Sequence, residues 1–290
     1  MADPIPFLFP GDPLRPRRVD GFFADEHAAA LKAGAEAFLV DHDALVRGDL
    51  REAVRGLPRG LGPVRYRGWM VPAARYAEFA RVLAERGCHP AVSAEDYRRA
   101  HELPGWYALF EAVTPRSVWC EADPGCAPDP GELAELVRPL RPGPGIVKDY
   151  VKSRKHEWAQ ACFVPDLADT GALHRTVVEL VRLQQEDLAG GVVVREFEEF
   201  DGAGEARVWW IGGEPALVGP HPDTPGAVPD PDLDPVRPAV AALGHPFVTT
   251  DLARRADGAW RVVEVGDGQV SGRPDGVAPE RLIGLLAGAR

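Results

Sequence analysis

The segment FVTTDLARRADGAWRVVEVGDG, residues 247–268, decides the fold of the C-terminal part of this chain. Two strand-like runs flank Asp257-Gly258, a pair that is strongly favoured in two-residue hairpin turns. If this pair forms the turn, Asp251 lies directly opposite Glu264 in the ladder. Two opposed carboxylates in an exposed sheet repel each other by roughly 0.2–1 kcal/mol, and a bound cation reverses the sign of that interaction. Because Mg²⁺ binds one or two carboxylates together with phosphates and waters, the segment predicts a site for a metal ion and a nucleotide.

Two other interpretations of this hairpin stay open. A different turn would change the register, and each carboxylate could instead pair with a nearby arginine. In either case the two acids would be structural and would not bind a metal.

The composition is that of an ordinary globular protein. The 290 residues are 45% hydrophobic and 27% charged, which suits one large domain or about two to three smaller ones. The net charge of −11 argues against nonspecific binding to nucleic acid, which requires a basic surface. The N-terminal residues lack the pattern of a secretion signal, and no apolar run is long enough to span a bilayer. We therefore expect a cytoplasmic protein with neither a nucleic-acid nor a membrane partner.

The N-terminal part alternates between strands and helices. Apolar runs at 5–9, 36–40 and 63–71 predict strands, and segments 24–34 and 73–87 predict helices that each end at a glycine. A further helix from residue 93 is expected to break at Pro104. Strands that alternate with helices are typical of a parallel sheet, so this part reads as a small α/β domain.

The composition then changes. Residues 114–145 are rich in proline and glycine, which indicates a domain boundary. A strand at 145–152 and a long helix at 169–191, capped by Asp169 or Thr170, follow this boundary. The remaining residues read as strands with tight turns, interrupted by a proline-rich loop at 219–238, and form an antiparallel α+β unit.

Lysine is rare and clustered. The 33 basic residues include only four lysines, and three of them, Lys148, Lys152 and Lys155, lie within one short segment. Arginine presents a planar fork, whereas lysine presents a compact point charge that can follow a phosphate oxygen. The segment is therefore either a phosphate-binding strand and loop or a plain solvated basic loop.

A second hairpin is predicted at Gly212-Gly213. The period of a strand places Glu205, Arg207 and Trp209 on one face of its first strand. The acid and the arginine would be a surface pair or, in a cleft, would hold a ribose hydroxyl and a phosphate.

Taken in order, these features resemble the ATP-grasp superfamily. The order is a strand with lysines, a helix, a strand that runs into REFEEF (195–200), a hairpin with Glu and Arg, and the hairpin with Asp251 and Glu264. VKDYVKSRKHEW (147–158) and VEVGDGQVSG (263–272) are most similar to a bacterial and phage clade of that superfamily, over about residues 115–285. The resemblance implies a mixed α/β and α+β protein with the ATP-grasp fold. Two α+β subdomains, 115–191 and 192–290, would grip ATP after a small Rossmann-like pre-ATP-grasp domain over 1–114.

The resemblance also implies how the first subdomain binds ATP. Lys148 would reach the α- and β-phosphates, with Arg116 as a second basic ligand, and Lys155 would lie in the loop that covers the phosphates. The hinge REFEE (195–199) would bind the base: the backbone of Glu196 and Phe197 would read adenine, the Phe197 ring would pack on it, and Glu199 belongs to the same nucleotide-binding hinge.

In the second subdomain, Glu205 resembles the ribose-binding acid of the superfamily. Arg207 would face the γ-phosphate or an acyl-phosphate. Asp251 and Glu264 match the paired Mg²⁺ ligands, in agreement with the register expected from the hairpin alone.

Two positions depart from the superfamily pattern. The last strand usually reads Glu-x-Asn, with the asparagine on a second metal, whereas this chain has Gly266, and Asp267 or Gln269 would have to replace it. The phosphate loop KSRKHEW (152–158) contains no glycine, so lysine side chains would replace the usual backbone N–H groups.

The activity that the resemblance implies is an ATP-dependent ligase. A carboxylate would attack the γ-phosphate of MgATP to give an acyl-phosphate and ADP, and an amine would then displace phosphate to form an amide or peptide bond. Lys155 and Arg207 would stabilise the transferring phosphoryl group. The substrates would be small-molecule or peptide carboxylates and amines. The alternatives are a kinase on the same scaffold, with Asp267 or His156 as its base, and a nucleotide-binding protein without turnover.

Overall fold

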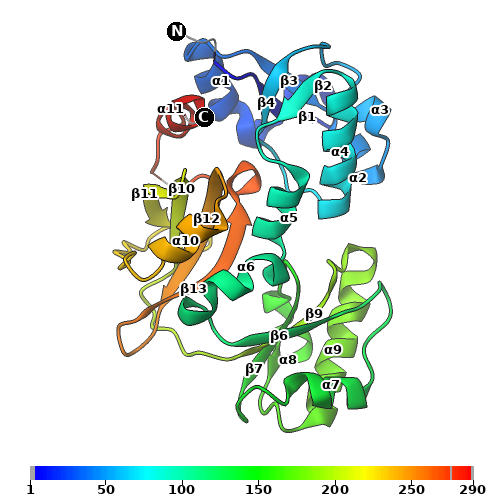
Figure 1. The fold of residues 1–290 in the computed structure, drawn as a ribbon, viewed down its shortest axis with the longest axis vertical. Helices are drawn as coiled ribbons and strands as arrows, with labels where there is room; N and C mark the ends of the chain where they lie inside the picture. The colour runs from blue at the N-terminus through cyan, green and yellow to red at the C-terminus, as the bar shows by residue number, and fades with distance from the viewer. Residues whose placement is uncertain (1–3, 275, 289–290) are drawn as a thin grey trace.

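The computed structural model describes residues 4–274 and 276–288, and within them three sheets follow one another along the long axis of the molecule (Figure 1). The N-terminal sheet lies at one end and the sheet of β6, β7, β8 and β9 at the other. The sheet of β10 to β13 lies between them, so a site between the last two sheets draws residues from both.

The N-terminal sheet is parallel, as predicted. Its strands β1 (Phe7–Asp12), β3 (Ala37–Val40), β4 (Gly62–Tyr66) and β5 (Cys88–Pro90) pair in parallel. Alternate β1 residues pack on opposite faces, with Leu8 in one apolar cluster and Phe7 and Phe9 in another, because successive strand side chains point to opposite sides. The helical segments of this part are η1 (Gly21–Phe23), α1 (Ala24–Lys32), α2 (His42–Arg47), α3 (Leu50–Ala53) and α4 (Ala73–Glu85).

One strand of this sheet was not predicted. β2 (Arg15–Val19) pairs antiparallel with the end of β1, and its arginines are exposed. Its sequence RPRRV has no apolar alternation, so only backbone pairing with β1 makes it a strand.

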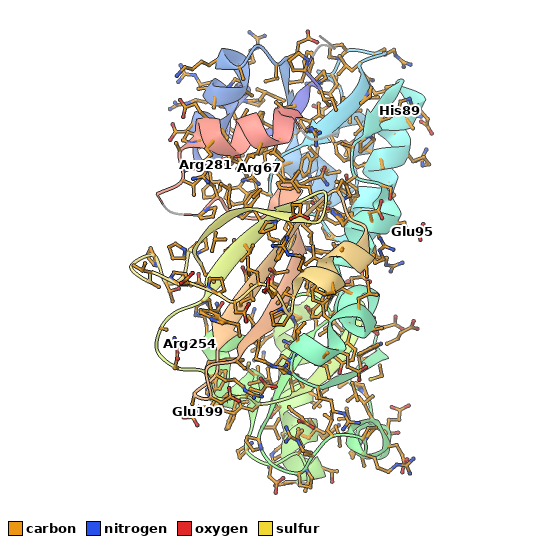
Figure 2. The ribbon with its side chains drawn as sticks, turned by 60° about the vertical axis from the view of Figure 1, so that its left-hand side comes forward. Arg67, His89, Glu95, Glu199, Arg254 and Arg281 are labelled. Carbon is orange, nitrogen blue, oxygen red and sulfur yellow. The ribbon has the colours of Figure 1, made fainter. Side chains whose placement is uncertain are left out.

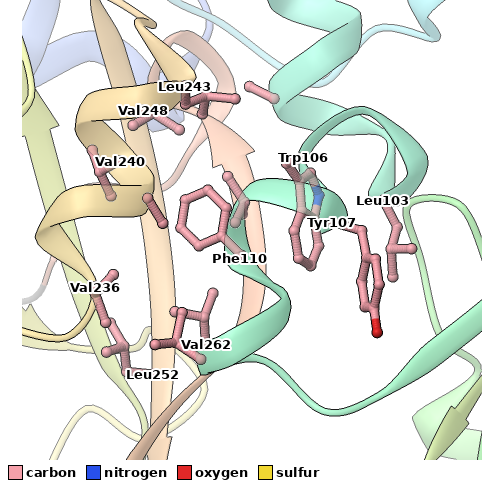
Figure 3. Packing of buried hydrophobic residues seen from close by; sticks show 14 of the residues in the cluster. Leu103, Trp106, Tyr107, Phe110, Val236, Val240, Leu243, Val248, Leu252 and Val262 are labelled. Atoms are coloured by element: carbon pink, nitrogen blue, oxygen red, sulfur yellow. The ribbon is translucent and has the colours of Figure 1, made fainter.

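The helix expected from residue 93 is two helices, α5 (Ala94–His101) and α6 (Leu103–Phe110), followed by η2 (Glu111–Val113). Pro104 does not simply end a helix; it lies in the first turn of α6, where its missing N–H costs nothing. Figure 3 shows Phe110 of α6 facing Val240 and Val262, and the three share one buried cluster. α6 therefore packs on the middle sheet and joins it to the preceding chain.

The second sheet is antiparallel, in the order β6-β9-β7-β8. Asp169 caps its long helix α9 by accepting a hydrogen bond from the N–H of Ala172 at 2.8 Å, as predicted. The helix ends at Gln184, before the glycines where its end was expected, and β6 was not predicted. The elements of this part are β6 (Ser117–Glu121), α7 (Pro130–Val137), β7 (Gly145–Asp149), η3 (Lys155–Glu157), α8 (Trp158–Ala161), β8 (Phe163–Val164), α9 (Thr170–Gln184), η4 (Gln185–Asp187) and β9 (Gly191–Glu196).

The third sheet has the order β11-β10-β12-β13 and is also antiparallel. Gly212-Gly213 forms the predicted two-residue turn, because Ile211 pairs with Glu214. Helices α10 and α11 were not predicted, and α11 returns to pack beside α1 (Figure 1). The elements here are β10 (Ala206–Ile211), β11 (Glu214–Pro220), α10 (Arg237–Leu243), β12 (Phe247–Arg254), β13 (Trp260–Asp267), η5 (Gly268–Val270) and α11 (Pro279–Gly288).

The hairpin of β12 and β13 has the predicted opposition but a different turn. Arg255 donates its N–H to Ala259 at 2.9 Å, and Gly258 adopts φ 88°, which is a three-residue turn with glycine in the left-handed region. This turn shifts the pairing by one residue, and a bulge after Asp251 shifts it back. Asp251 therefore does lie opposite Glu264, although the two-residue turn used to predict it was wrong.

A buried arginine joins the N-terminal domain to the end of β13. The Arg67 side chain is 1% exposed and donates to both carboxylate oxygens of Glu26, at 2.6 and 2.9 Å. Its Nη1 also donates to the carbonyl oxygens of Gln269 at 3.0 Å and Ser271 at 2.8 Å. Figure 2 shows Arg67 inside the molecule, below the C-terminal helix. These bonds hold the loop after β13 in place.

We predict that Arg67→Met lowers the free energy of unfolding by about 3–5 kcal/mol, because Glu26 would stay buried without its cation. The measurement is denaturant unfolding followed by circular dichroism. The matched control is Lys32→Met, which breaks the exposed Lys32–Glu280 pair and should cost less than about 1 kcal/mol. Equal losses in the two variants would contradict the assigned importance of Arg67.

Candidate active site between two sheets

A cavity of ≈ 250 Å³ lies between the second and third sheets. Its walls come from β7, from the following loop, from the hinge after β9 and from the hairpin of β12 and β13. The predicted site residues that line it are Lys148, Lys155, Glu196, Phe197, Glu205, Asp251 and Glu264. Those among the predicted residues that lie outside its lining are Arg116, Glu199, Arg207 and Asp267.

The two opposed carboxylates lie in contrasting surroundings. Arg207 donates a fork to Asp251, with Nε 2.8 Å from Oδ1 and Nη2 2.7 Å from Oδ2. Within the described residues no hydrogen bond reaches the carboxylate of Glu264. Burial alone would raise the pKa of Glu264, but the charges of Lys152, Lys148 and Arg207 outweigh it and hold that pKa below its ordinary value. Glu264 is therefore an ionised acid that faces the cavity with free oxygens.

Both interpretations of the hairpin thus find partial support. The fork from Arg207 is the arginine pair that was left open as an alternative for Asp251. It also means that Arg207 approaches the cavity only through Asp251, so its predicted contact with a phosphate stays a prediction.

The donor set suits Mg²⁺ that arrives with a nucleotide. Across residues 4–274 and 276–288, no three His, Cys, Asp or Glu side chains gather closely enough to hold a metal by themselves. Two carboxylates on one wall of a cavity are the usual protein contribution to Mg²⁺, since phosphate oxygens and waters complete the shell. Asp251 and Glu264 are the residues that would hold it.

Two buried cations face these acids. Lys148 and Arg195 are each 7% exposed, and both line the cavity. Burial lowers the pKa of Lys148 to about 8 and that of Arg195 to about 10, although the charge of Glu264 opposes both shifts. Arg195 donates Nε to Ser117 at 3.0 Å and Nη1 to the Val263 carbonyl at 2.8 Å, while its buried Nη2 has no hydrogen-bond partner.

Burying two like charges side by side is unfavourable unless an anion joins them. Sequence reasoning missed Arg195, although it immediately precedes the predicted hinge. Its signal was an arginine in the otherwise apolar strand GVVVRE.

Lys155 reaches the cavity from the loop after β7. It forms an ion pair with Asp223, which belongs to the proline-rich loop of the third sheet. Burial would lower the pKa of Lys155, but the hydrogen bond and charge of Asp223 raise it. The pair therefore bridges the two walls, and Lys155 stays charged at neutral pH.

The hinge after β9 is held by its backbone and by ion pairs. The N–H of Glu196 donates to the Arg116 carbonyl at 2.8 Å and that of Phe197 donates to the Pro144 carbonyl at 3.0 Å. These two N–H groups are therefore not available to a base, so only the carbonyl side of the predicted backbone reading fits. The Glu196 carboxylate accepts three hydrogen bonds from Arg141, at 2.6 to 2.9 Å.

The side chains of the hinge point in different directions. The Phe197 ring lies edge-on to Phe163, with ring centroids 5.5 Å apart, so the predicted aromatic wall is present. Glu198 lines the cavity and binds Arg261 at 2.9 Å. Glu199 is exposed at the outer edge of the molecule (Figure 2), where no base could reach it. Arg116 is exposed as well, and its carbonyl is its contact with the hinge.

Glu205 and a residue that sequence reasoning missed, His221, complete the wall. Burial and the charge of Asp251 raise the pKa of Glu205. Nε2 of His221 lies 3.5 Å from Oδ2 of Asp251. The histidine follows a strand and opens a proline-rich loop, and no local pattern marked it as part of the site.

The structure does not support Asp267 as a metal ligand. Its carboxylate is fully buried 3.1 Å from Nε2 of His245, and Oδ1 accepts the N–H of Gln269 at 2.7 Å. The Gln269 amide contacts the Tyr76 hydroxyl at 3.1 Å, so it is not a replacement either. The bulge in the hairpin keeps Asp251 and Glu264 opposed, but residues beyond Gly266 turn away towards the N-terminal domain.

The family follows from the sequence as well as from this geometry. Residues 127–286, more than half of the chain, match the model of an ATP-grasp domain family, the third family of its clade. The chain therefore belongs to this ATP-grasp domain family, and its fold is the ATP-grasp fold. It matches no curated protein in sequence.

Solved structures with the same fold cover nearly the whole chain. The RimK domain ATP-grasp protein of Sphaerobacter thermophilus aligns with a TM-score of 0.62 at 16% identity, over 97% of this chain and 98% of that one. D-cycloserine synthetase DcsG aligns with a TM-score of 0.64 at 17% identity, over the same shares. The ATP-grasp ligase PsnB, solved with precursor peptide PsnA2 and AMPPNP, aligns with a TM-score of 0.57 at 15% identity, over 99% of this chain and 97% of that one.

Within the described ranges, every helix is too short or too polar to cross a membrane.

We predict that nucleotide affinity falls as the pH rises through about 8. Burial lowers the pKa of Lys148 to about 8, so its charge is complete below that pH and is lost above it. If a phosphate needs this charge, MgADP should bind up to about tenfold more weakly at pH 9 than at pH 7. Isothermal titration calorimetry measures the change. Lys148→Arg, which stays charged, should bind with nearly the same affinity at both pH values, and a wild type without pH dependence would rule out this dependence on Lys148.

Proposed function

We propose that the protein is an ATP-dependent ligase that activates a carboxylate as an acyl-phosphate, with release of ADP, and joins it to an amine. The observation that carries this proposal is that one cavity places two buried cations opposite two carboxylates of a hairpin. That arrangement suits a polyphosphate with its metal ion, because the cations would meet phosphate oxygens and the acids would meet Mg²⁺. Membership of the ATP-grasp family supports the same reading.

The chain would act by holding and neutralising charge. Lys148 and Arg195 would bind phosphate oxygens, and Glu205 would accept a ribose hydroxyl. Phe197 would form a wall for the base. MgATP supplies the phosphoryl group. Arg207 and Lys155 would stabilise the charge that develops during the transfer, in a site that needs no nucleophilic side chain.

The bonds made and broken define the reaction. A substrate carboxylate oxygen would bond to the γ-phosphorus while the bond from that phosphorus to the ADP oxygen breaks. The amine nitrogen would then bond to the acyl carbon, inorganic phosphate would leave, and the nitrogen would lose a proton. The products would be an amide, ADP and phosphate.

The substrates are proposed only as a class, a small-molecule or peptide carboxylate and an amine. One structural neighbour is named for a small product and another was solved with a precursor peptide, so the fold accommodates both. The net charge of −11 supports the absence of a nucleic-acid partner. We place the activity in the cytoplasm, where ATP is supplied.

One observation favours nucleotide binding without turnover as the second candidate. Asp267, the expected replacement for the asparagine on a second metal, is buried away from the cavity. The kinase alternative loses support, because Asp267 and the exposed His156, the two bases considered for it, both lie outside the cavity lining.

We predict that saturating MgATP raises the melting temperature of the wild type by roughly 5–10 °C. A ligand at about 100 times its Kd adds about 2.7 kcal/mol to stability, and this is the shift expected at this chain length. Lys148→Ala and Glu264→Ala should lose most of it, whereas Lys32→Ala, a lysine on the exposed face of α1, should keep it. No shift with any nucleotide in the wild type would overturn the proposed function.

We predict that Glu264→Gln weakens MgATP by tenfold or more but leaves the affinity for ATP in EDTA unchanged or better. A carboxylate that binds the metal helps only when the metal is present, and without it the same charge repels phosphate. Calorimetry with and without Mg²⁺ measures both affinities, and Glu95→Gln on the outer face of α5 is the control. Equal losses in the two conditions would assign Glu264 a purely structural role.

A further inference from the structure

His221 is held rigidly at the edge of the cavity by a short turn. Its N–H donates to the Glu205 carbonyl at 2.8 Å, and its own carbonyl accepts the N–H of Thr224 at 2.8 Å. The Thr224 hydroxyl in turn accepts the N–H of Glu205 at 3.3 Å. The side chain is 14% exposed and lines the cavity. The imidazole therefore has a fixed position, tied to Glu205 of the same wall.

The same turn selects one tautomer of the ring. The N–H of Asp223 points at Nδ1 of His221 at 3.0 Å, so Nδ1 is the acceptor. In a neutral imidazole the proton must then be on Nε2. Nε2–H is the group that the ring presents to the site.

That donor has no adequate acceptor within the described residues. Asp251 Oδ2 lies 3.5 Å away, which is longer than a good N–H···O bond, and both oxygens of Asp251 already accept the fork of Arg207. Lys155 and Arg207 flank the ring and offer no acceptor, and Asp223 lies on the Nδ1 side. An under-used donor between two cations indicates that an anionic oxygen belongs in this corner of the cavity.

We infer that His221 donates its Nε2–H to the terminal phosphate of the bound nucleotide. The inference rests on the proposed function, because Mg²⁺ held by Asp251 would bridge the two outer phosphates and bring them to this corner. His221 would then distinguish a nucleoside triphosphate from a diphosphate. A residue that only positioned Asp251 would affect both nucleotides equally through the metal.

Two substitutions separate these roles. The side-chain amide of His221→Gln can place an N–H close to the position of Nε2, whereas that of His221→Asn reaches only the position of Nδ1. The probes are MgAMPPNP and MgADP, with both dissociation constants measured by calorimetry for each protein. The measured quantity is the preference for MgAMPPNP over MgADP.

We expect His221→Asn to reduce this preference about tenfold, because a hydrogen bond to a charged oxygen is lost, and His221→Gln to keep it within about threefold. An unchanged preference in His221→Asn, or equal weakening of both nucleotides, would overturn the inference and leave the proposed function standing. A wild type that binds neither nucleotide would overturn both.

A measurement on the wild type alone covers the case in which a variant fails to fold. Nitrogen-15 chemical shifts of the His221 ring should show an unprotonated Nδ1 and a protonated Nε2. MgAMPPNP should move the Nε2 signal substantially more than MgADP does. The opposite tautomer, or equal shifts with the two nucleotides, would overturn the inference.

Discussion

The site depends on the opposition of Asp251 and Glu264 across one rung of the third sheet. Like charges at this spacing repel, so the rest of the site can be understood as what compensates them. Arg207 comes from the neighbouring strand and takes Asp251, while the lysines after β7 lower the pKa of Glu264 from the opposite sheet. Neither sheet balances its own charge, and the cavity between them is where the two sets meet.

This arrangement leaves a surplus that a ligand would resolve. Lys148 and Arg195 are buried as cations, and an Arg195 N–H group has no partner. Near the other end of the cavity, His221 presents a donor with no good acceptor. Unsatisfied buried groups cost free energy, so their concentration in one cavity indicates that the protein keeps them for an anion. Mg²⁺ and the phosphates of ATP match these groups in charge.

The parts of the fold that could be predicted are those with local signals. Asp169 capped a helix where its side chain could reach the N–H of Ala172 in the first turn, and Gly212-Gly213 made a turn that few other residues permit. Strand β2 and helices α10 and α11 escaped because their short or exposed sequences carry no periodicity of their own. The turn at Gly258 was predicted one residue too short, and the bulge that restored the register has no signature in the chain.

By itself the sequence determined the type and order of the site chemistry: a lysine strand, a hinge, and two acids placed to face each other. Those features depend on spacing within one hairpin or one strand, where chain geometry leaves few choices. Only the tertiary structure decided which side chains share the cavity. It brought in Arg195 and His221, bound Arg207 to Asp251, and turned Asp267 towards His245. These outcomes depend on how separate sheets pack, and contacts between residues far apart in the chain leave no mark in the local pattern.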